Sequence, residues 1–337
     1  MVGAGSSRGM ANHTTMDIAV LDLGSASFHL LHARCWPDGS VIPLRSMREA
    51  VHLGEGVART GAITREAWAR GIEATDRLMA RIEPWGVPRL VTVATGVLRD
   101  ACNGRDFVDA LRARYGLPVE ILSRDAEAAL AYRGARSEFS SRLGRFCVVD
   151  LGGGSIEIAV GEQHASLWSC SLPLGVLRLR DLLGSEPGRG HREAGAALAD
   201  LHRAFASAGR AVRGFAPAWL VLASGTARAV RDLVVATEGG HVGKRLLTAQ
   251  SIRTARHHAW TTSPGELRRL GVAPDRVATI PYAAIAIEAL LDELGQDEAW
   301  VSRHGLREGV ILRELDAASA SRRANLEIVA LEQAGAA

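Results

Sequence analysis

The segment Asp150-Leu-Gly-Gly-Gly-Ser-Ile-Glu157 carries most of the information about the fold of this 337-residue chain. It lies within RFCVVDLGGGSIEIAVG, residues 145–161, where two apolar runs flank a glycine-rich turn that holds an acid. Short apolar runs bounded by glycine predict strands, so the segment indicates a strand–turn–strand hairpin. The segment Asp22-Leu-Gly-Ser-Ala-Ser27 has the same pattern, between strands predicted over residues 17–23 and 27–34. A repeated pattern of this kind predicts two units of similar architecture.

Both turns have the chemistry of an anion-binding site. In each, an acid ends a buried strand, and the glycine that follows allows a tight turn whose backbone N–H groups point toward one place. Serine hydroxyls in and beside the turns add uncharged donors. We therefore predict that a phosphate chain lies between the two turns. Its predicted ligands there are Gly24, Ser25, Ser27, Gly152, Gly153, Gly154 and Ser155.

Three carboxylates, those of Asp22, Asp150 and Glu157, are predicted to face the same phosphates. Carboxylates and phosphates repel each other unless a cation lies between them, and Mg²⁺ is the natural partner of such oxygen ligands. Mg²⁺ also neutralises the charge that develops during phosphoryl transfer. These three acids are accordingly the predicted metal ligands. The competing interpretation is that both turns are ordinary tight hairpins with solvated acids.

Further helices and strands follow each hairpin. Strands are predicted over residues 89–94, 119–122 and 219–223, and helices over residues 65–81, 106–115, 125–133, 265–270, 283–294 and from 307 onward. This organisation predicts an α/β chain of two lobes with a cleft between them. The predicted division is a tail over residues 1–15, a first lobe over 16–133 and a second lobe over 134–312, with a final helix over about 313–337 that packs on the first lobe.

The composition excludes several functional classes. A formal net charge of +3 gives no general attraction to nucleic acid or to an anionic membrane. Lys244 is the only lysine, and neither a P-loop nor a protein-kinase pattern surrounds it. The four cysteines show no zinc-site or disulfide spacing. Because the polar N-terminal tail contains no signal-peptide core and no apolar run is long enough to span a membrane, we expect the protein in the cytoplasm.

Eight segments, in order along the chain, resemble the exopolyphosphatase and guanosine pentaphosphate phosphohydrolase family, within the sugar kinase, heat-shock protein 70 and actin superfamily. They are DLGSASFHLL from Asp22, VHLGEGVARTG from Val51, ATGVLRDACN from Ala94, LSRDAEAALAYRGA from Leu122, DLGGGSIEI from Asp150, SLPLGVLRL from Ser171, ASGTARAV from Ala223 and GLREGVI from Gly305. The DLGGGS turn alone is typical of the whole superfamily, whereas the ordered set is much more specific. The resemblance implies a two-lobed actin-like ATPase fold of the ribonuclease H-like type, with an interdomain cleft.

The resemblance also implies roles for single residues. Glu127 falls on the family's catalytic base, which orients and deprotonates the water that attacks the terminal phosphorus. Arg99 falls on an arginine that holds phosphate across the cleft. The two turns fall on the family's phosphate and metal loops, with Mg²⁺ as the implied cofactor. Without the resemblance, Glu127 would be interpreted as an exposed helix acid and Arg99 as half of a surface ion pair.

The chain departs from the family pattern near the predicted site. Ala26 stands where the family usually has Asn, so an amide donor near the phosphate is lost. The motif Gly-x-Glu-Glu is replaced by Arg124-Asp125-Ala126-Glu127, which retains only the second Glu. Ile156 and His52 stand where Thr and Arg are common. These departures concern rate and substrate preference more than the fold.

The leading hypothesis is an exopolyphosphatase that uses Mg²⁺ to hydrolyse the terminal phosphoanhydride of inorganic polyphosphate. Hydrolysis of guanosine pentaphosphate is an open alternative, because nothing in the sequence separates the two substrates. A sensor that binds polyphosphate or the alarmone without turnover is a further one, and Ala26 favours it. A kinase fits less well, because the matching segments are those of hydrolases. The expected partners are polyphosphate or guanosine pentaphosphate, with a homodimer left open and no nucleic acid or membrane expected.

Overall fold

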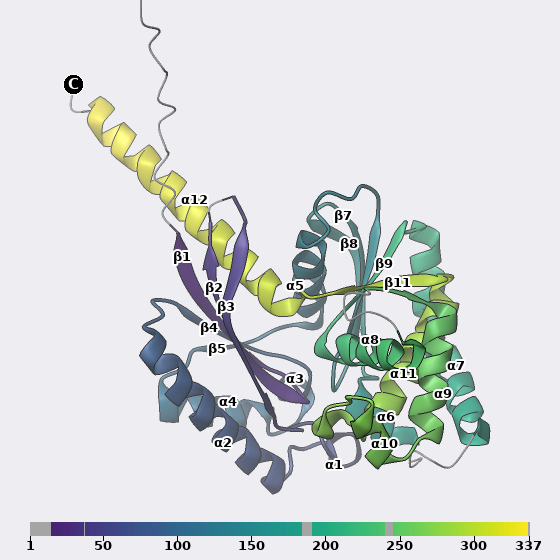
Figure 1. Cartoon of the computed structure of the whole chain (residues 1–337). Coiled ribbons are helices and arrows are strands. Elements are labelled where there is room, and N and C mark those ends of the chain that lie inside the picture. The colour runs from purple at the N-terminus through teal and green to yellow at the C-terminus, as the bar shows by residue number, and fades with distance from the viewer. Residues whose placement is uncertain (1–14, 37, 184–190, 240–244, 336–337) are drawn as a thin grey trace, which may run out of the picture.

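The protein has two lobes, each built on a mixed β-sheet with helices packed against it (Figure 1). The structure, a computed structural model, describes residues 15–36, 38–183, 191–239 and 245–335. The predicted N-terminal tail lies almost entirely outside these residues. None of the helices described combines the length and the apolar character that crossing a membrane requires.

The first lobe contains a five-stranded sheet. Its strands lie in the order β3 (Val41–Ala50), β2 (Ser27–Cys35), β1 (Met16–Leu23), β4 (Leu90–Ala94) and β5 (Val119–Ile121). Successive side chains of a strand point to opposite faces, so Ala19 and Leu21 of β1 pack against α2 (Arg65–Ile82) and α4 (Gly104–Tyr115). Ile18 and Val20 pack on the other face, against the start of α12 (Leu306–Gly335). Burial on both faces explains why β1 is a continuous apolar run in the sequence.

The second lobe contains a six-stranded sheet. Its strands lie in the order β10 (Leu246–Thr248), β11 (Glu298–Ser302), β9 (Trp219–Ala223), β6 (Phe146–Leu151), β7 (Ile156–Glu162) and β8 (Ala165–Leu172). The helical elements of this lobe are α6 (Val176–Leu183), α7 (His191–Phe215), α8 (Gly225–Glu238), α9 (Ala249–Thr261), α10 (Pro264–Arg269), η2 (Pro274–Arg276) and α11 (Ile280–Leu294). Most of them join one face of the sheet in a hydrophobic core, in which α11 is buried along nearly its whole length.

The two sheets share one strand arrangement, which confirms the predicted repeat. In the first lobe β1 pairs antiparallel with β2 and parallel with β4, and in the second β6 pairs antiparallel with β7 and parallel with β9. The registers also agree, because Asp22 lies opposite His29 and Asp150 lies opposite Glu157, each pair one step from its turn. His29 therefore has the position in the first hairpin that Glu157 has in the second. The predicted two-lobed α/β fold is confirmed.

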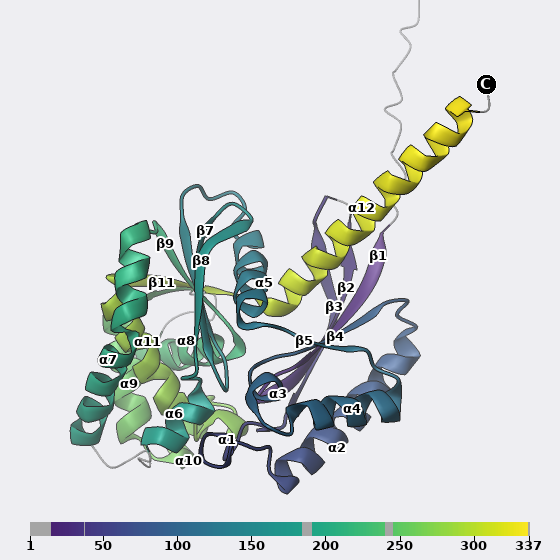
Figure 2. The ribbon, with the colours of Figure 1, turned by 180° about the vertical axis from the view of Figure 1, so that it is seen from behind.

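Helix α5 (Arg124–Ser137) lies between the two sheets and beside the start of α12 in both ribbon views (Figures 1 and 2). Its Leu130 packs in the core of the first lobe, while Tyr132 packs on the sheet of the second. The two helices cross where glycines bring their backbones together. A Cβ on Gly134 would lie 1.8 Å from the carbonyl oxygen of Gly305, and a Cβ on Gly309 would lie 1.9 Å from that of Leu130. The crossing therefore holds α5 in place through direct backbone contact.

Candidate active site

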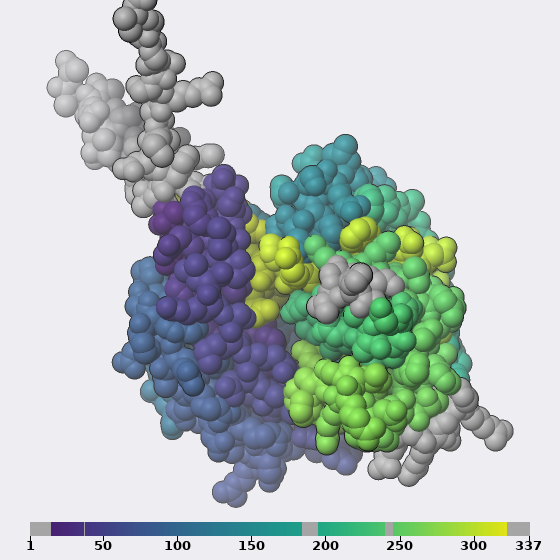
Figure 3. Space-filling model, viewed as in Figure 1, coloured from purple at the N-terminus to yellow at the C-terminus, as the bar shows by residue number. Residues whose placement is uncertain are grey.

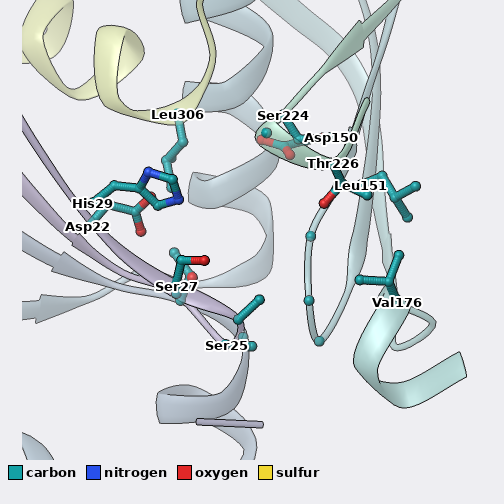
Figure 4. A pocket seen from close by; sticks show the side chains of 18 of the residues that line it. Asp22, Ser25, Ser27, His29, Asp150, Leu151, Val176, Ser224, Thr226 and Leu306 are labelled. Atoms are coloured by element: carbon teal, nitrogen blue, oxygen red, sulfur yellow. The ribbon is translucent and has the colours of Figure 1, made fainter. Parts of the chain in front are cut away.

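The turns that follow β1 and β6 line one cavity of about 140 Å³, which we call the first cavity (Figure 4). In the space-filling view the start of α12 lies between the two lobes (Figure 3). The first cavity brings together eleven of the twelve predicted site residues, and Arg99 is the exception. The eleven are Asp22, Gly24, Ser25, Ser27, Glu127, Asp150, Gly152, Gly153, Gly154, Ser155 and Glu157.

The two turns touch each other, and glycine is required where they do. A Cβ on Gly153 would lie 2.8 Å from the Cβ of Ala26 and 2.9 Å from its backbone nitrogen. A Cβ on Gly154 would lie 2.7 Å from Ser25 Oγ. Ser25 Oγ also accepts a hydrogen bond from the Val97 N–H at 3.1 Å. Side chains at these glycines would push the turns apart, so the glycines allow both lobes to reach one ligand.

Six carboxylates line the first cavity: the four predicted ones of Asp22, Glu127, Asp150 and Glu157, together with those of Asp275 and Glu308. Burial raises the pKa of Asp22 to about 7, although the charge of Arg307 opposes the shift. Burial, with the charges of Glu127 and Asp22, raises the pKa of Asp150 to about 8. Burial and the negative charges of Glu127 and Asp150 hold the pKa of Glu157 well above its usual range. The site therefore favours an added positive charge, in the form of protons or of a cation.

Glu127 reaches the first cavity from the first turn of α5. The helix begins after Ser123, whose Oγ accepts a hydrogen bond from the Ala126 N–H at 3.2 Å. Glu127 is buried, and its Oε2 accepts a hydrogen bond from Arg99 Nη1 at 2.6 Å. Burial raises the pKa of Glu127, while the bond from Arg99 and its charge act in the opposite direction.

Arg99 lies against Glu127 and outside the lining of the first cavity. Its Nη1 also donates to the carbonyl of Leu122 at 3.0 Å, and its Nε lies 3.4 Å from Asp100 Oδ1. Its Nη2 is buried and has no hydrogen-bond partner among the described residues. The geometry assigns Arg99 to the support of Glu127, and its contact with phosphate stays a prediction.

Four arginines that were not identified from the sequence also line the first cavity: Arg48, Arg228, Arg276 and Arg307. They surround His29, whose Nδ1 lies 3.4 Å from Arg307 Nη1. Burial and these four positive charges hold the pKa of His29 well below its usual value, so its imidazole is neutral. A signal existed for Arg228 and Arg307, which lie in the segments ASGTARAV and GLREGVI. The other two lie on β3 and in η2, outside any motif.

Comparison with known proteins settles the family of the chain. The Ppx/GppA phosphatase family matches residues 37–318. The chain belongs to this family. Seven of the eight segments lie within the matched residues, and the first, from Asp22, precedes them.

Relatives in the Ppx/GppA family carry two functional names. Exopolyphosphatase 1 of Mycobacterium tuberculosis is 30% identical over 311 residues, which cover 89% of each protein. The guanosine-5'-triphosphate,3'-diphosphate pyrophosphatase of Vibrio atlanticus is 27% identical, and the aligned part covers 88% of this chain and 59% of the Vibrio protein. Among solved structures, an exopolyphosphatase from Cytophaga hutchinsonii has a TM-score of 0.81 at 24% identity, over 90% of this chain and 98% of that one. An Aquifex aeolicus member of the family has a TM-score of 0.71 at 24% identity, with the same coverage. These structures support the fold.

The acids of this Ppx/GppA phosphatase suit the Mg²⁺ that the sequence predicts. Among the described residues, no group of three or more His, Cys, Asp or Glu side chains forms a metal cage. Mg²⁺ seldom uses such a cage, because it keeps several waters and binds one or two carboxylates together with substrate phosphates. Asp22, Asp150 and Glu157 supply oxygen ligands of this type, in a site whose raised pKa values favour a cation. The residues therefore fit Mg²⁺ that is shared with a phosphorylated ligand.

Proposed function

We propose that this Ppx/GppA phosphatase is a Mg²⁺-dependent exopolyphosphatase, which removes the terminal phosphate of inorganic polyphosphate as orthophosphate. The observation that carries the proposal is that both glycine-rich turns, the carboxylates and Glu127 line one cavity. The similarity to exopolyphosphatase 1 over 89% of both chains supports polyphosphate as the substrate. The cytoplasmic location predicted from the sequence is part of the proposal.

In the proposed complex, the terminal phosphate of the chain lies between the two turns. Backbone N–H groups of the turns that contain Gly24 and Gly153 donate to its oxygens. Ser25 Oγ accepts its hydrogen bond from Val97, so the hydroxyl hydrogen of Ser25 remains available for a phosphate oxygen. Mg²⁺, held by the phosphates together with one or two of the carboxylates of Asp22, Asp150 and Glu157, would supply the positive charge that stabilises the developing negative charge.

Glu127 is the general base of the proposed reaction. Arg99 engages its Oε2, and in the proposed reaction Oε1 accepts a proton from a water molecule. The water oxygen forms a bond to the terminal phosphorus while the bond from that phosphorus to the bridging oxygen breaks. The electron pair of the broken bond leaves with the shortened chain, and the attacking oxygen becomes part of orthophosphate. A positioned base of this kind typically contributes on the order of 10²–10⁴ in rate.

A phosphate-release assay tests the proposal. Purified protein and Mg²⁺ are incubated with short polyphosphate, long polyphosphate, guanosine pentaphosphate or ATP, and released orthophosphate is measured. We expect release from polyphosphate and loss of that release in Glu127→Gln. Guanosine pentaphosphate is included because the Vibrio relative carries its name. If orthophosphate were released only from guanosine pentaphosphate, that nucleotide would be the substrate in place of polyphosphate. If the protein bound these compounds but released no phosphate from any of them, the sensor hypothesis would be favoured.

A further inference from the structure

A second cavity, of about 430 Å³, continues the first one away from the catalytic acids. The two cavities share six lining residues: His29, Arg48, Gly225, Arg228, Arg276 and Arg307. The remainder of its lining comes from β3, from α8 and from residues 271–273. Its volume is on the order of ten times the ~30 Å³ that one water molecule occupies in the liquid, so it has room for more than one phosphate group.

Positive charge dominates the second cavity. Five arginines line it: Arg48, Arg228, Arg231, Arg276 and Arg307. Arg48 forms an ion pair with Asp275, which lines only the first cavity. Arg231 forms an ion pair with Asp232 at 2.6 Å, and the side chain of Asp232 is 56% exposed. Arg228, Arg276 and Arg307 form no ion pair with the residues that the structure describes, so three of the five guanidinium groups lack a directly contacting carboxylate there.

These arginines lie close enough to repel one another. Burial and the charge of Arg48 lower the pKa of Arg276 to about 10. Burial and the charge of Arg307 also lower the pKa of Arg228. The packing allows the crowding, because Gly225 has no side chain where a Cβ would lie 2.6 Å from Arg276 Nη2. A ligand with several negative charges would relieve the repulsion, and guanidinium groups grip phosphate oxygens in pairs.

We propose that the second cavity binds the phosphate units of polyphosphate that precede the terminal one, and thereby selects chains long enough to reach it. This inference rests on the proposed function, because it places the remainder of the same substrate. The described lining contains no Trp, Tyr or Phe on which a nucleobase could stack. A continuous polyanion therefore suits this cavity better than a nucleoside.

Chain-length kinetics test the inference. Arg231→Gln changes a residue that lines only the second cavity, and Arg276→Gln changes one that lines both. Arg210→Gln, at an exposed position of α7, is the control for loss of one positive charge. KM is measured for tripolyphosphate and for long-chain polyphosphate at constant Mg²⁺ and ionic strength. We expect Arg231→Gln to raise KM for the long chain about ten-fold and for tripolyphosphate much less, with no change in Arg210→Gln. An equal change for both lengths would overturn the inference.

A binding measurement distinguishes failure of this inference from failure of the proposed function. In a Glu127→Gln background, Kd is measured calorimetrically for tripolyphosphate, long-chain polyphosphate and guanosine pentaphosphate, with and without Arg231→Gln. If the parent protein releases no phosphate but Arg231→Gln still weakens long-chain binding about ten-fold, the activity fails and the cavity assignment stands. An unchanged Kd for the long chain would overturn the assignment. A larger loss for guanosine pentaphosphate than for the long chain would overturn it in favour of a nucleotide site.

Discussion

Arg99 and Glu127 form an ion pair at 2.6 Å, with the two side chains only 13% and 10% exposed. The pair joins α3 (Gly96–Asp100) to the first turn of α5 and occupies one oxygen of the carboxylate. Burial alone would favour the protonated carboxyl, which cannot accept a proton from water, and Arg99 counteracts that effect. The arginine that the resemblance assigns to phosphate thus lies where it orients the proposed base and favours its ionised form.

We predict that Glu127→Gln abolishes most phosphate release and leaves the binding of polyphosphate intact. Glutamine retains the shape of the side chain and accepts a hydrogen bond, but it cannot take a proton from the attacking water. We expect kcat to fall by about 10²–10⁴. Asp125→Asn, an exposed acid in the same helical turn, is the matched control and should retain the parental rate. If Glu127→Gln released phosphate at the parental rate, Glu127 would not be the general base.

The pH profile of Arg99→Gln tests the support that Arg99 gives to the base. Glu127 works as the ionised base, so activity should rise as pH increases through its pKa in the folded protein. Arg99 lowers that pKa, so its removal should raise it and move the acidic limb of the kcat/KM profile to higher pH. The profile is measured at saturating Mg²⁺. Arg124→Gln, which breaks only the half-exposed pair with Asp100, should leave the limb unchanged. A limb that does not move in Arg99→Gln would contradict the prediction.

The turns could be predicted from the sequence because their chemistry is local. An acid, a glycine turn and a serine lie within eight residues in the second hairpin, and the backbone itself brings them together. The role of Glu127 as a base was predicted only through the resemblance, because an acid in the first turn of a helix is common on protein surfaces. The arginines of the second cavity come from β3, α8, η2 and α12, and only the tertiary fold places them side by side.

Three of the strands missing from the sequence prediction, β3, β10 and β11, have few of the signals on which it depends, whereas the longer helices α7, α8 and α9 were missed despite their length. β3 is an edge strand whose side chains are mostly exposed, and it contains Pro43, so it lacks an apolar alternation. β10 has three residues and β11 has five, both too short for a clear pattern. α5 continues past the predicted end at Arg133 to Ser137, because packing against α12 extends the helix. The proposed boundary between residues 133 and 134 stays a prediction.

We predict that Asp150→Asn and Glu157→Gln each raise the Mg²⁺ concentration needed for half-maximal activity by about ten-fold, because each removes a charged oxygen ligand. Activity on polyphosphate is titrated with Mg²⁺ for each variant. Glu162→Gln changes an exposed acid at the end of the same strand, β7, and should give the parental curve. Parental curves for both Asp150→Asn and Glu157→Gln would leave the metal assignment without support.

The crossing of α5 and α12 predicts a link between packing and catalysis. Gly134→Ala would place its Cβ 1.8 Å from a backbone oxygen, so the helices must separate. We expect the free energy of unfolding to fall by about 2–3 kcal/mol, and kcat to fall because α5 carries Glu127. Gly214→Ala in α7, where a Cβ would meet no atom within 4 Å, should leave kcat unchanged and stabilise the protein by up to about 1 kcal/mol. Equal stability of both variants in urea unfolding would contradict the predicted contact.

Ala26 lines the first cavity beside Gly153, and its carbonyl accepts hydrogen bonds from the N–H groups of Val51 and His52 at 3.0 and 2.9 Å. These bonds hold the backbone, so a longer side chain must extend into the cavity. Ala26→Asn would add an amide donor there, and we expect kcat on polyphosphate to rise about ten-fold if the bond forms in the transition state. Ala26→Leu has similar bulk without the amide and should lower the rate. Equal rates for the two variants would show that the missing amide does not limit turnover, and a fall in both would show that the cavity has repacked around Ala26.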